Sequence, residues 1–286
     1  MSCKKYFFFP ILILHLFTTN IHARPFSEIK ASGKLVIVTT EDEINIVKDK
    51  SGSIMGGFNF ELAKAFAASL NLTIETRIIN DFGMYFSIDK AGADIRKDSE
   101  YIPYIFTSET ADIAVDLITR TNWRERLFSM VPIIKNKQIL FTRTSNPKKI
   151  NNFSDLAGAR FILLKDSTYL ATFENLIRPK VKSISFELES ALDLNCVEAV
   201  MDGRFEYSII DSITFIQYKR RYPNLKKVVP VSDEEDLCWA IRADNPELVK
   251  ALKNFLDEFK RTDEFHKIFR RYFLIPYFSY RILLEK

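Results

Sequence analysis

The most constraining feature of the sequence is a strand, a helix and a second strand that follow one another directly. Leu35–Val38 is an uninterrupted apolar run, which suits a strand buried on both faces. Apolar residues recur at intervals of three and four along Phe60–Leu70, so we predict a helix capped by Asn59. Asn71 fits the left-handed position at which a helix ends, and Thr73–Ile79 returns as a strand. This order predicts an α/β fold with a mostly parallel sheet.

Later segments continue the alternation of strands and helices. Four further short strands are predicted at 113–115, 139–141, 161–164 and 207–210. Apolar residues line one face of a predicted helix from Leu188 to Val200, and Asn245 with Pro246 predicts the start of another helix. The polar stretch Arg143–Asn152 is a candidate junction, so we expect two α/β units.

The N-terminus has the layout of a secretory signal peptide. Lys4 and Lys5 precede the apolar run Tyr6–Phe17, which is 12 residues long, and Ala23 ends the region. A membrane-spanning helix needs roughly 20 apolar residues, so we predict a signal peptide over residues 1–23 and a periplasmic mature chain. An uncleaved N-terminal anchor is the alternative interpretation.

Charge, histidine and cysteine content exclude several classes of function. The formal net charge is +4, and the 41 Lys and Arg residues are spread along the chain, so we expect no nucleic-acid partner. Beyond the signal region His266 is the one histidine, and its place beside an apolar helical stripe predicts a solvent-facing residue. Cys196 and Cys238 are the remaining cysteines, and we expect two separate buried thiols. We therefore predict neither a metal nor a cofactor.

A strand that leads into polar residues marks a candidate binding site. Ile113–Val115 is followed by Thr119, Thr121 and Arg124 in a Thr-x-Thr-x-x-Arg pattern. Open α/β sheets bind ligands outside the carboxyl ends of their strands, and an arginine offers a planar fork that matches a carboxylate. The alternative is that the arginines of this segment are ordinary surface charges on a short helix.

Five segments in order along the chain resemble family 3 of the bacterial extracellular solute-binding proteins, the polar-amino-acid receptors of ABC importers. The segments are Gly57–Ala63 (GFNFELA), Tyr101–Ile113 (YIPYIFTSETADI), Thr119–Ser129 (TRTNWRERLFS), Phe153–Gly158 (FSDLAG) and Glu198–Asp211 (EAVMDGRFEYSIID). The resemblance runs from about Ile29 to Tyr272, so it covers nearly the whole chain beyond the signal region.

The resemblance implies a type II periplasmic binding protein fold, in which two α/β lobes are joined by two crossing strands and hold the ligand in the cleft between them. Lobe one would comprise residues 24–139 and 233–286, and lobe two residues 140–232. The outgoing crossing would lie near Ile139–Arg143 and the return near Val228–Ser232. Two crossings allow the lobes to close without either one unfolding.

The resemblance also assigns ligand-binding roles to residues of both lobes. Arg124 matches the arginine that holds the ligand's α-carboxylate, and Thr119 matches a threonine that adds a hydroxyl donor. Asp211 matches the aspartate that receives the α-ammonium group. Ser167–Thr168 occupy the place of a turn that also reaches the carboxylate, and Lys165 would add positive charge there. The alternatives are a strand-end turn residue for Asp211 and a helix N-cap for Thr168.

Several features depart from the family pattern. The acidic loop Glu41–Asn45 follows the first strand in place of an aromatic-proline element, and it would face either a cation or water. Leu117 replaces a small residue, and the chain is short after Arg124, so Arg126 competes as the ligand arginine. The segment Asn80–Tyr101 is long, and its aromatic residues would either wall the ligand or pack on the lobe. These residues are Phe82, Tyr85, Phe86 and Tyr101.

Together these observations predict a periplasmic solute-binding protein that captures a small polar solute, above all an amino acid, for ABC-type import. We expect a monomer that is not an enzyme, with a small-molecule ligand and the membrane subunits of an ABC importer as partners. A stand-alone sensor with the same fold is one alternative, and a cyclohexadienyl dehydratase-like enzyme with Glu43 as an acid is another. A lytic transglycosylase is disfavoured, because only Phe273–Lys286 follow Tyr272.

Overall fold

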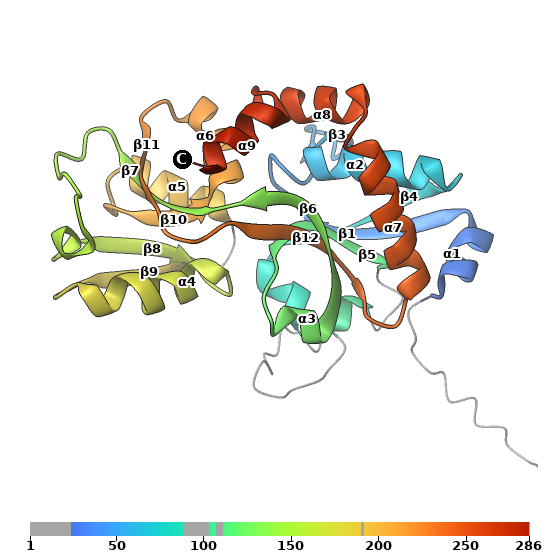
Figure 1. The fold of residues 1–286 in the computed structure, drawn as a ribbon, viewed down its shortest axis with the longest axis horizontal. Coiled ribbons are helices and arrows are strands. Elements are labelled where there is room, and N and C mark those ends of the chain that lie inside the picture. Colours follow the sequence, from blue (N-terminus) through green and yellow to red (C-terminus); the bar gives the residue numbers. More distant parts are fainter. Residues whose placement is uncertain (1–23, 88–102, 107–110, 190–191, 286) are drawn as a thin grey trace, which may run out of the picture.

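The computed structural model of the chain describes residues 24–87, 103–106, 111–189 and 192–285. The predicted signal peptide over residues 1–23 lies outside the described residues. Strands and helices alternate along the chain, and they form two lobes joined at the centre of the molecule (Figure 1). The predicted α/β class is therefore confirmed.

One sheet of five strands forms the first lobe. Its strands are β1 (Lys34–Thr40), β4 (Thr73–Ile79), β5 (Ile113–Thr119), β6 (Phe128–Asn136) and β12 (Glu235–Arg242). The order is β4-β1-β5-β12-β6, with β1 parallel to β4 and β5 and with β12 antiparallel to β5 and β6. The prediction of a mostly parallel sheet is thus wrong for the half of the sheet that contains β12 and β6. β12 runs antiparallel to its neighbours because it enters the sheet on the chain's return from the second lobe.

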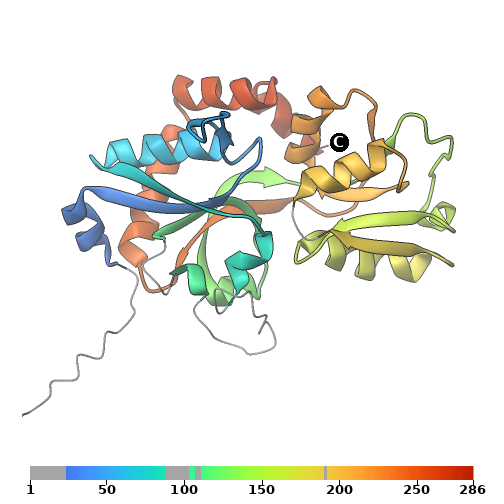
Figure 2. The same cartoon turned by 180° about the vertical axis from the view of Figure 1, so that it is seen from behind.

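Helices and turns cover both faces of this sheet (Figures 1 and 2). The elements are α1 (Phe26–Ser32), β2 (Val47–Lys48), β3 (Ile54–Gly56), α2 (Phe58–Ser69), η1 (Phe82–Phe86), η2 (Tyr104–Phe106), α3 (Arg124–Leu127), α7 (Pro246–Phe259), α8 (Asp263–Phe273) and α9 (Tyr277–Glu285). Ile37 and Val115 pack in one apolar cluster with α2, α7 and α8, whereas Val38 and Ala114 pack in another with η1 and η2. Alternate residues of each strand therefore supply the two faces.

The start of α2 differs from the prediction. The helix begins at Phe58, and Asn59 is a buried residue of its first turn rather than its cap. The Asn59 amide donates to Asn45 Oδ1 at 2.5 Å and accepts from Trp239 Nε1 at 3.0 Å. Gly57 precedes the helix with φ +139°, and a Cβ there would lie 2.2 Å from the carbonyl oxygen of Asn45. This close approach of two backbones, which only glycine permits, fixes the helix start.

Other predicted helix ends agree with the structure. Asn71 has φ 57° just after α2, as expected for the left-handed position. The Asn245 side chain accepts from the backbone N–H of Leu248, and Pro246 is the first residue of α7. His266 is exposed on α8, as predicted.

The second lobe contains two small sheets. The strands are β7 (Gln138–Arg143), β8 (Arg160–Leu164), β9 (Ser185–Glu189), β10 (Ser208–Asp211) and β11 (Leu225–Pro230). β10, β7 and β11 form an antiparallel sheet in that order, and β8 pairs in parallel with β9. A bridge between Phe161 and Tyr207 brings β8 alongside the segment that enters β10. The apolar cluster of this lobe is separate from the clusters of the first lobe.

Helices of the second lobe pack on these sheets. They are η3 (Phe153–Leu156), α4 (Thr168–Thr172), η4 (Phe173–Ile177), η5 (Arg178–Lys180), α5 (Asp193–Met201) and α6 (Ser212–Arg221). The predicted helix from Leu188 is wrong at its start, because Leu188 belongs to β9 and α5 begins at Asp193. The apolar spacing around Leu188 fits the start of a helix and a strand equally well. The pairing of this segment with β8 makes it a strand. Cys196 and Cys238 are free buried thiols, as predicted.

Two connections join the lobes. β6 passes into β7 between Asn136 and Gln138, and β11 passes into β12 between Pro230 and Glu235. Helix α9 lies over both connections: the hydroxyl of Tyr280 donates to the carbonyl oxygen of Lys135 at 2.7 Å, and Arg281 pairs with Glu234 at 3.4 Å. No helix within the described ranges has the length and hydrophobicity to cross a bilayer.

Candidate functional site

A cavity of about 700 Å³, a figure that includes its opening to solvent, lies between the two lobes. The first lobe lines it with Thr40, Asp42, Ile44, Asn45, Phe82, Asp116, Leu117, Thr119 and Arg124. The second lobe lines it with Leu164, Ser167, Thr168, Tyr169, Leu192, Asp193, Asp211, Thr214 and Tyr218. The carboxyl ends of the parallel strands β1 and β5 reach this cavity, which is where an open α/β sheet binds its ligands.

Two aspartates of the first lobe, the lobe-one pair Asp42 and Asp116, are held by neutral donors. Asp116 Oδ2 accepts from the hydroxyls of Thr40 at 2.7 Å and Tyr85 at 3.0 Å. Asp42 accepts from the backbone N–H of Ile44 and from the backbone and side-chain N–H groups of Asn45, each at 2.7 Å. Burial, and then the charge of Asp116, raises the pKa of Asp42 to about 7. Burial also raises the pKa of Asp116.

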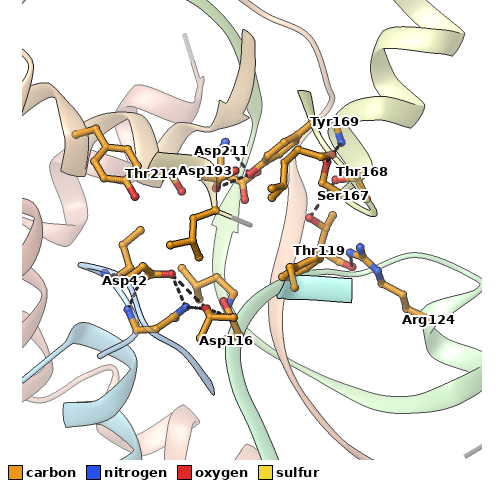
Figure 3. A pocket seen from close by; sticks show the side chains of 18 residues that line it. Asp42, Asp116, Thr119, Arg124, Ser167, Thr168, Tyr169, Asp193, Asp211 and Thr214 are labelled. Carbon is orange, nitrogen blue, oxygen red and sulfur yellow. Dashed lines mark hydrogen bonds between the residues drawn. The ribbon is translucent and has the colours of Figure 1, made fainter. Parts of the chain in front are cut away.

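Two aspartates of the second lobe, the lobe-two pair Asp193 and Asp211, face them across the cavity (Figure 3). The Tyr169 hydroxyl donates to Asp193 Oδ2 at 3.3 Å, and Asn136 Nδ2 donates to Asp211 Oδ1 at 2.6 Å. Burial raises the pKa of Asp193 to about 7. Burial, and then the charges of Glu235 and Asp193, raises the pKa of Asp211 well above its usual range. Four carboxylates thus surround one cavity, and each is costly to ionise there.

Arg124 is the one basic residue among the described residues that line the cavity. It is 1% exposed, and its guanidinium donates to the carbonyl oxygens of Thr119 at 2.8 Å and Asp166 at 3.2 Å. The guanidinium carbon lies 4.7 Å from the ring centroid of Phe86 and 5.4 Å from that of Trp123. Since Asp166 belongs to the second lobe, Arg124 connects the two lobes.

A chain of polar contacts runs from the cavity to the connections between the lobes. The Thr168 hydroxyl lies 3.3 Å from that of Thr119, and Gln138 Nε2 donates to the Thr168 hydroxyl at 2.9 Å. The same Gln138 nitrogen lies 3.3 Å from Glu235 Oε2, and Asn136 Nδ2 donates to Glu235 Oε1 at 3.1 Å. Side chains of the site therefore contact the residues at which the lobes are joined.

The structure brings most of the predicted site residues together. Thr119, Arg124, Ser167–Thr168 and Asp211 all line the cavity. Ser167 rather than Thr168 caps α4, since its hydroxyl accepts from Tyr169 N. Lys165 is the exception and a correction: it does not line the cavity, its side chain is 55% exposed, and it pairs with Asp166 at 3.8 Å. The left-handed turn at Asp166 follows it and directs the chain into α4, so Lys165 remains at the surface.

The features that depart from the family pattern also find their places. Arg126 is exposed and does not line the cavity, unlike Arg124. Phe82 lines the cavity, whereas Tyr85 and Phe86 are buried in the lobe; Tyr101 lies outside the described residues. In the described part of this segment, one aromatic side chain therefore faces the cavity and two pack within the lobe.

The acidic loop divides between two environments. Asp42 faces the cavity, whereas Glu43 bonds with the second lobe, through Arg221 Nη1 at 3.2 Å and Gln217 Nε2 at 3.3 Å. Sequence reasoning missed Asp116 and Asp193 altogether. The available signal was an aspartate within the apolar run of β5, where a buried charge needs a partner or a function.

The model of the bacterial extracellular solute-binding proteins of family 3 matches residues 96–275. Arginine-binding protein from T. maritima, in a P235GK mutant, has a similar structure with a TM-score of 0.69 and 18% identity, over 87% of this chain and 99% of that one. An amino acid ABC transporter substrate-binding protein from Streptococcus pneumoniae, bound to L-arginine, has a TM-score of 0.69 and 21% identity, over 87% and 98%. This likeness confirms the predicted two-lobe type II periplasmic binding fold.

The curated relatives of the chain carry the name of an enzyme. The chain is 26% identical over 239 residues to membrane-bound lytic murein transglycosylase F from Saccharophagus degradans, which is 82% of this chain and 43% of the relative. Further relatives carry the same name, and the chain spans about half the length of those it matches. The prediction that the chain is not an enzyme is contradicted by these relatives, because they are named as an enzyme. The sequence resemblance pointed to a lytic transglycosylase as one alternative, but that alternative was disfavoured because only Phe273–Lys286 follow Tyr272.

Proposed function

Because the chain belongs to the bacterial extracellular solute-binding proteins of family 3, we propose that its cleft captures a small, positively charged polar solute of the amino acid class. The lobes close over this solute and release it when they open. Membership of the family supports solute binding as the function. The chemical class of the solute is our inference from the residues of the cleft.

The observation that carries the proposal is the composition of the cavity wall. Four aspartates and one arginine line it among the described residues, and the arginine already contacts two carbonyl oxygens. Carboxylates buried in this way favour a cation, because a nearby positive charge stabilises the ionised carboxylate in place of the water that burial removes. Micromolar binding corresponds to about −8 kcal/mol, which a ligand as small as an amino acid can reach when both lobes contact it.

We assign the ligand contacts to Thr119, Ser167–Thr168 and Asp211, as the family resemblance implies, and add the other three aspartates of the cavity. Arg124 completes the site from the first lobe and contacts the second. The lobes are proposed to comprise residues 24–139 with 233–286, and residues 140–232. Their closure is supported by the contacts that already cross the cleft between Arg124 and Asp166 and between Glu43 and Arg221.

The cellular setting is part of the same proposal. We propose a signal peptide over residues 1–23, a periplasmic mature chain that acts as a monomer, and delivery of the solute to the membrane subunits of an ABC importer. The family is one of extracellular proteins, which supports export. Two of the similar solved structures are an arginine-binding protein and an amino acid ABC transporter substrate-binding protein bound to L-arginine. Their ligands support the proposed solute class.

A thermal-shift screen of the purified protein against basic, neutral and acidic amino acids tests the proposal. We expect basic amino acids to raise the melting temperature by several degrees at millimolar concentration, and acidic amino acids to leave it unchanged. Asp211→Asn should remove the shift. A protein that responds only to acidic amino acids, or to none of the set, would refute the proposed solute class.

A second candidate function is favoured by the curated relatives. Since these are named murein transglycosylases, we propose as the alternative that the binding cleft serves an activity on murein. Release of soluble fragments from purified murein sacculi by the purified protein is the test. Release above a heat-inactivated control supports this function, and none above that control, in a preparation that binds its solute, refutes it.

A further inference from the structure

We propose that the ligand of this cleft carries two cationic groups, one held by the lobe-one pair Asp42 and Asp116 and the other by the lobe-two pair Asp193 and Asp211. The inference rests on the proposed function, because it names the chemistry of the solute that the same cleft binds. The ligand class is that of diamines and diamino acids.

The first argument is the arrangement of the four carboxylates. Figure 3 shows the lobe-one pair and the lobe-two pair on opposite sides of the cavity, with one pair contributed by each lobe. Among the described residues, none of the four forms an ion pair with a basic side chain, although Asp116 is only 7% exposed and Asp211 only 5% exposed. A single cation of the ligand would compensate one pair and leave the carboxylates of the other pair without a cationic partner.

The second argument comes from Asp193. Its Oδ1 atom is buried and accepts no hydrogen bond from any described residue, whereas Oδ2 accepts from Tyr169. Asp193 lines the cavity, so a donor on the ligand can reach this oxygen. Buried carboxylate oxygens are normally satisfied, and one left open in a ligand cavity indicates a donor that the ligand supplies. This oxygen belongs to the lobe opposite the Asp42 carboxylate, as two separate cations require.

The third argument concerns the ligand's own anionic group. Two nitrogens of the Arg124 guanidinium donate to the carbonyl oxygens of Thr119 and Asp166, and its face lies against Phe86 and Trp123. The positive charge of the cavity is therefore already engaged with protein groups. A carboxylate on the ligand is not required for binding, so diamines and diamino acids share the recognised chemistry.

Isothermal titration at pH 8 with three probes of matched chain length tests the inference. L-lysine carries two cations and a carboxylate, cadaverine carries the two cations alone, and L-norleucine carries the carboxylate with one cation. We expect cadaverine to bind within about tenfold of L-lysine, and L-norleucine to bind at least about a hundredfold more weakly, as the loss of charged hydrogen bonds predicts. A ratio of lysine to cadaverine affinity far above ten would overturn the inclusion of free diamines, and a ratio near one would support it.

Variants then connect each cation to its pair. Asp42→Asn and Asp193→Asn should each weaken L-lysine binding about tenfold to a hundredfold. Asp257→Asn is the matched control, because Asp257 is an exposed aspartate of α7 that does not line the cavity. This control should leave the affinity unchanged, and circular dichroism of all three variants checks that they fold.

The outcomes separate the inference from the proposed function. L-norleucine binding as tightly as L-lysine would overturn the inference and leave a solute-binding cleft for amino acids. An unchanged L-lysine affinity in both Asp42→Asn and Asp193→Asn would overturn the assignment of the two pairs. Binding of none of the three probes would overturn the inference and the cationic solute class together.

Discussion

Replacing Asp193 with asparagine should stabilise the unliganded protein at alkaline pH while it weakens ligand binding. Burial raises the pKa of Asp193 from 3.8 to about 7. The native state therefore binds the proton more tightly than the unfolded chain. The resulting stabilisation is fully present below pH 3.8 and is lost as the pH rises through about 7. Above that pH the ionised side chain destabilises the fold, and Asp193→Asn cannot ionise.

The size of this effect follows from the shift. One pKa unit corresponds to about 1.4 kcal/mol, so with allowance for solvent screening at the cleft we expect Asp193→Asn to raise the free energy of unfolding by roughly 2–4 kcal/mol at pH 8. In a protein of this size that is a rise in melting temperature of roughly 5–10 °C. Near pH 4 the variant and the wild type should melt within about 2 °C of each other.

Differential scanning calorimetry of the unliganded wild type, Asp193→Asn and the control Asp257→Asn at the two pH values is the assay. Asp257 is exposed on α7, so its variant should follow the wild type at both pH values. A melting temperature of Asp193→Asn at or below that of the wild type at pH 8 would refute the reasoning, because Asp193 would then not be an uncompensated buried charge.

Three further predictions concern the same cleft. Binding of a cationic solute should release protons and should become tighter as the pH rises from 6 to 8. Burial raises the pKa of Asp42 and Asp193 to about 7, and a bound cation favours their ionised forms. Calorimetric titrations in buffers of different ionisation enthalpy detect the released protons, and equal apparent enthalpies in all buffers would contradict the prediction. Arg221→Gln should weaken binding less than about fivefold, because the Arg221–Glu43 pair is exposed and such pairs contribute about 0–1 kcal/mol; a hundredfold loss in titration would show that this pair governs closure. Arg124→Lys should lower the free energy of unfolding by about 2–3 kcal/mol, since lysine lacks the planar fork that reaches the carbonyl oxygens of Thr119 and Asp166. Urea denaturation measures this loss of stability, and an unchanged denaturation midpoint would contradict the prediction.

Local signals in the sequence were sufficient for much of the fold. The apolar run Leu35–Val38 became a fully buried strand, and Asn71 and Asn245 marked helix ends where predicted, because each depends on its own neighbours. The start of α2 failed at Asn59, which contacts Asn45 and Trp239 instead of capping the helix. Contacts across many residues of sequence decide that position, and a local pattern cannot contain them.

The candidate site was predicted in part for a similar reason. Thr119, Arg124 and Asp211 belong to segments that resemble the family, so their placement at the cavity could be anticipated. Asp193 became visible only when the two lobes were brought together, whereas Asp116 had a local signal that was missed, an aspartate within the apolar run of β5. The prediction for Lys165 failed because the chain turns toward the cavity only at Asp166, after Lys165, whose side chain stays at the surface. The prediction that the chain is not an enzyme is contradicted by the relatives named as lytic murein transglycosylases. That alternative was disfavoured because only Phe273–Lys286 follow Tyr272.

A crystal structure of the protein with L-lysine tests the central claim most directly. We predict lysine enclosed between the lobes, with one of its amino groups within about 3 Å of a carboxylate of Asp193 or Asp211 and the other within about 3 Å of Asp42 or Asp116. Lysine bound elsewhere on the surface, or bound in the cleft with only one amino group in contact with an aspartate, would contradict it.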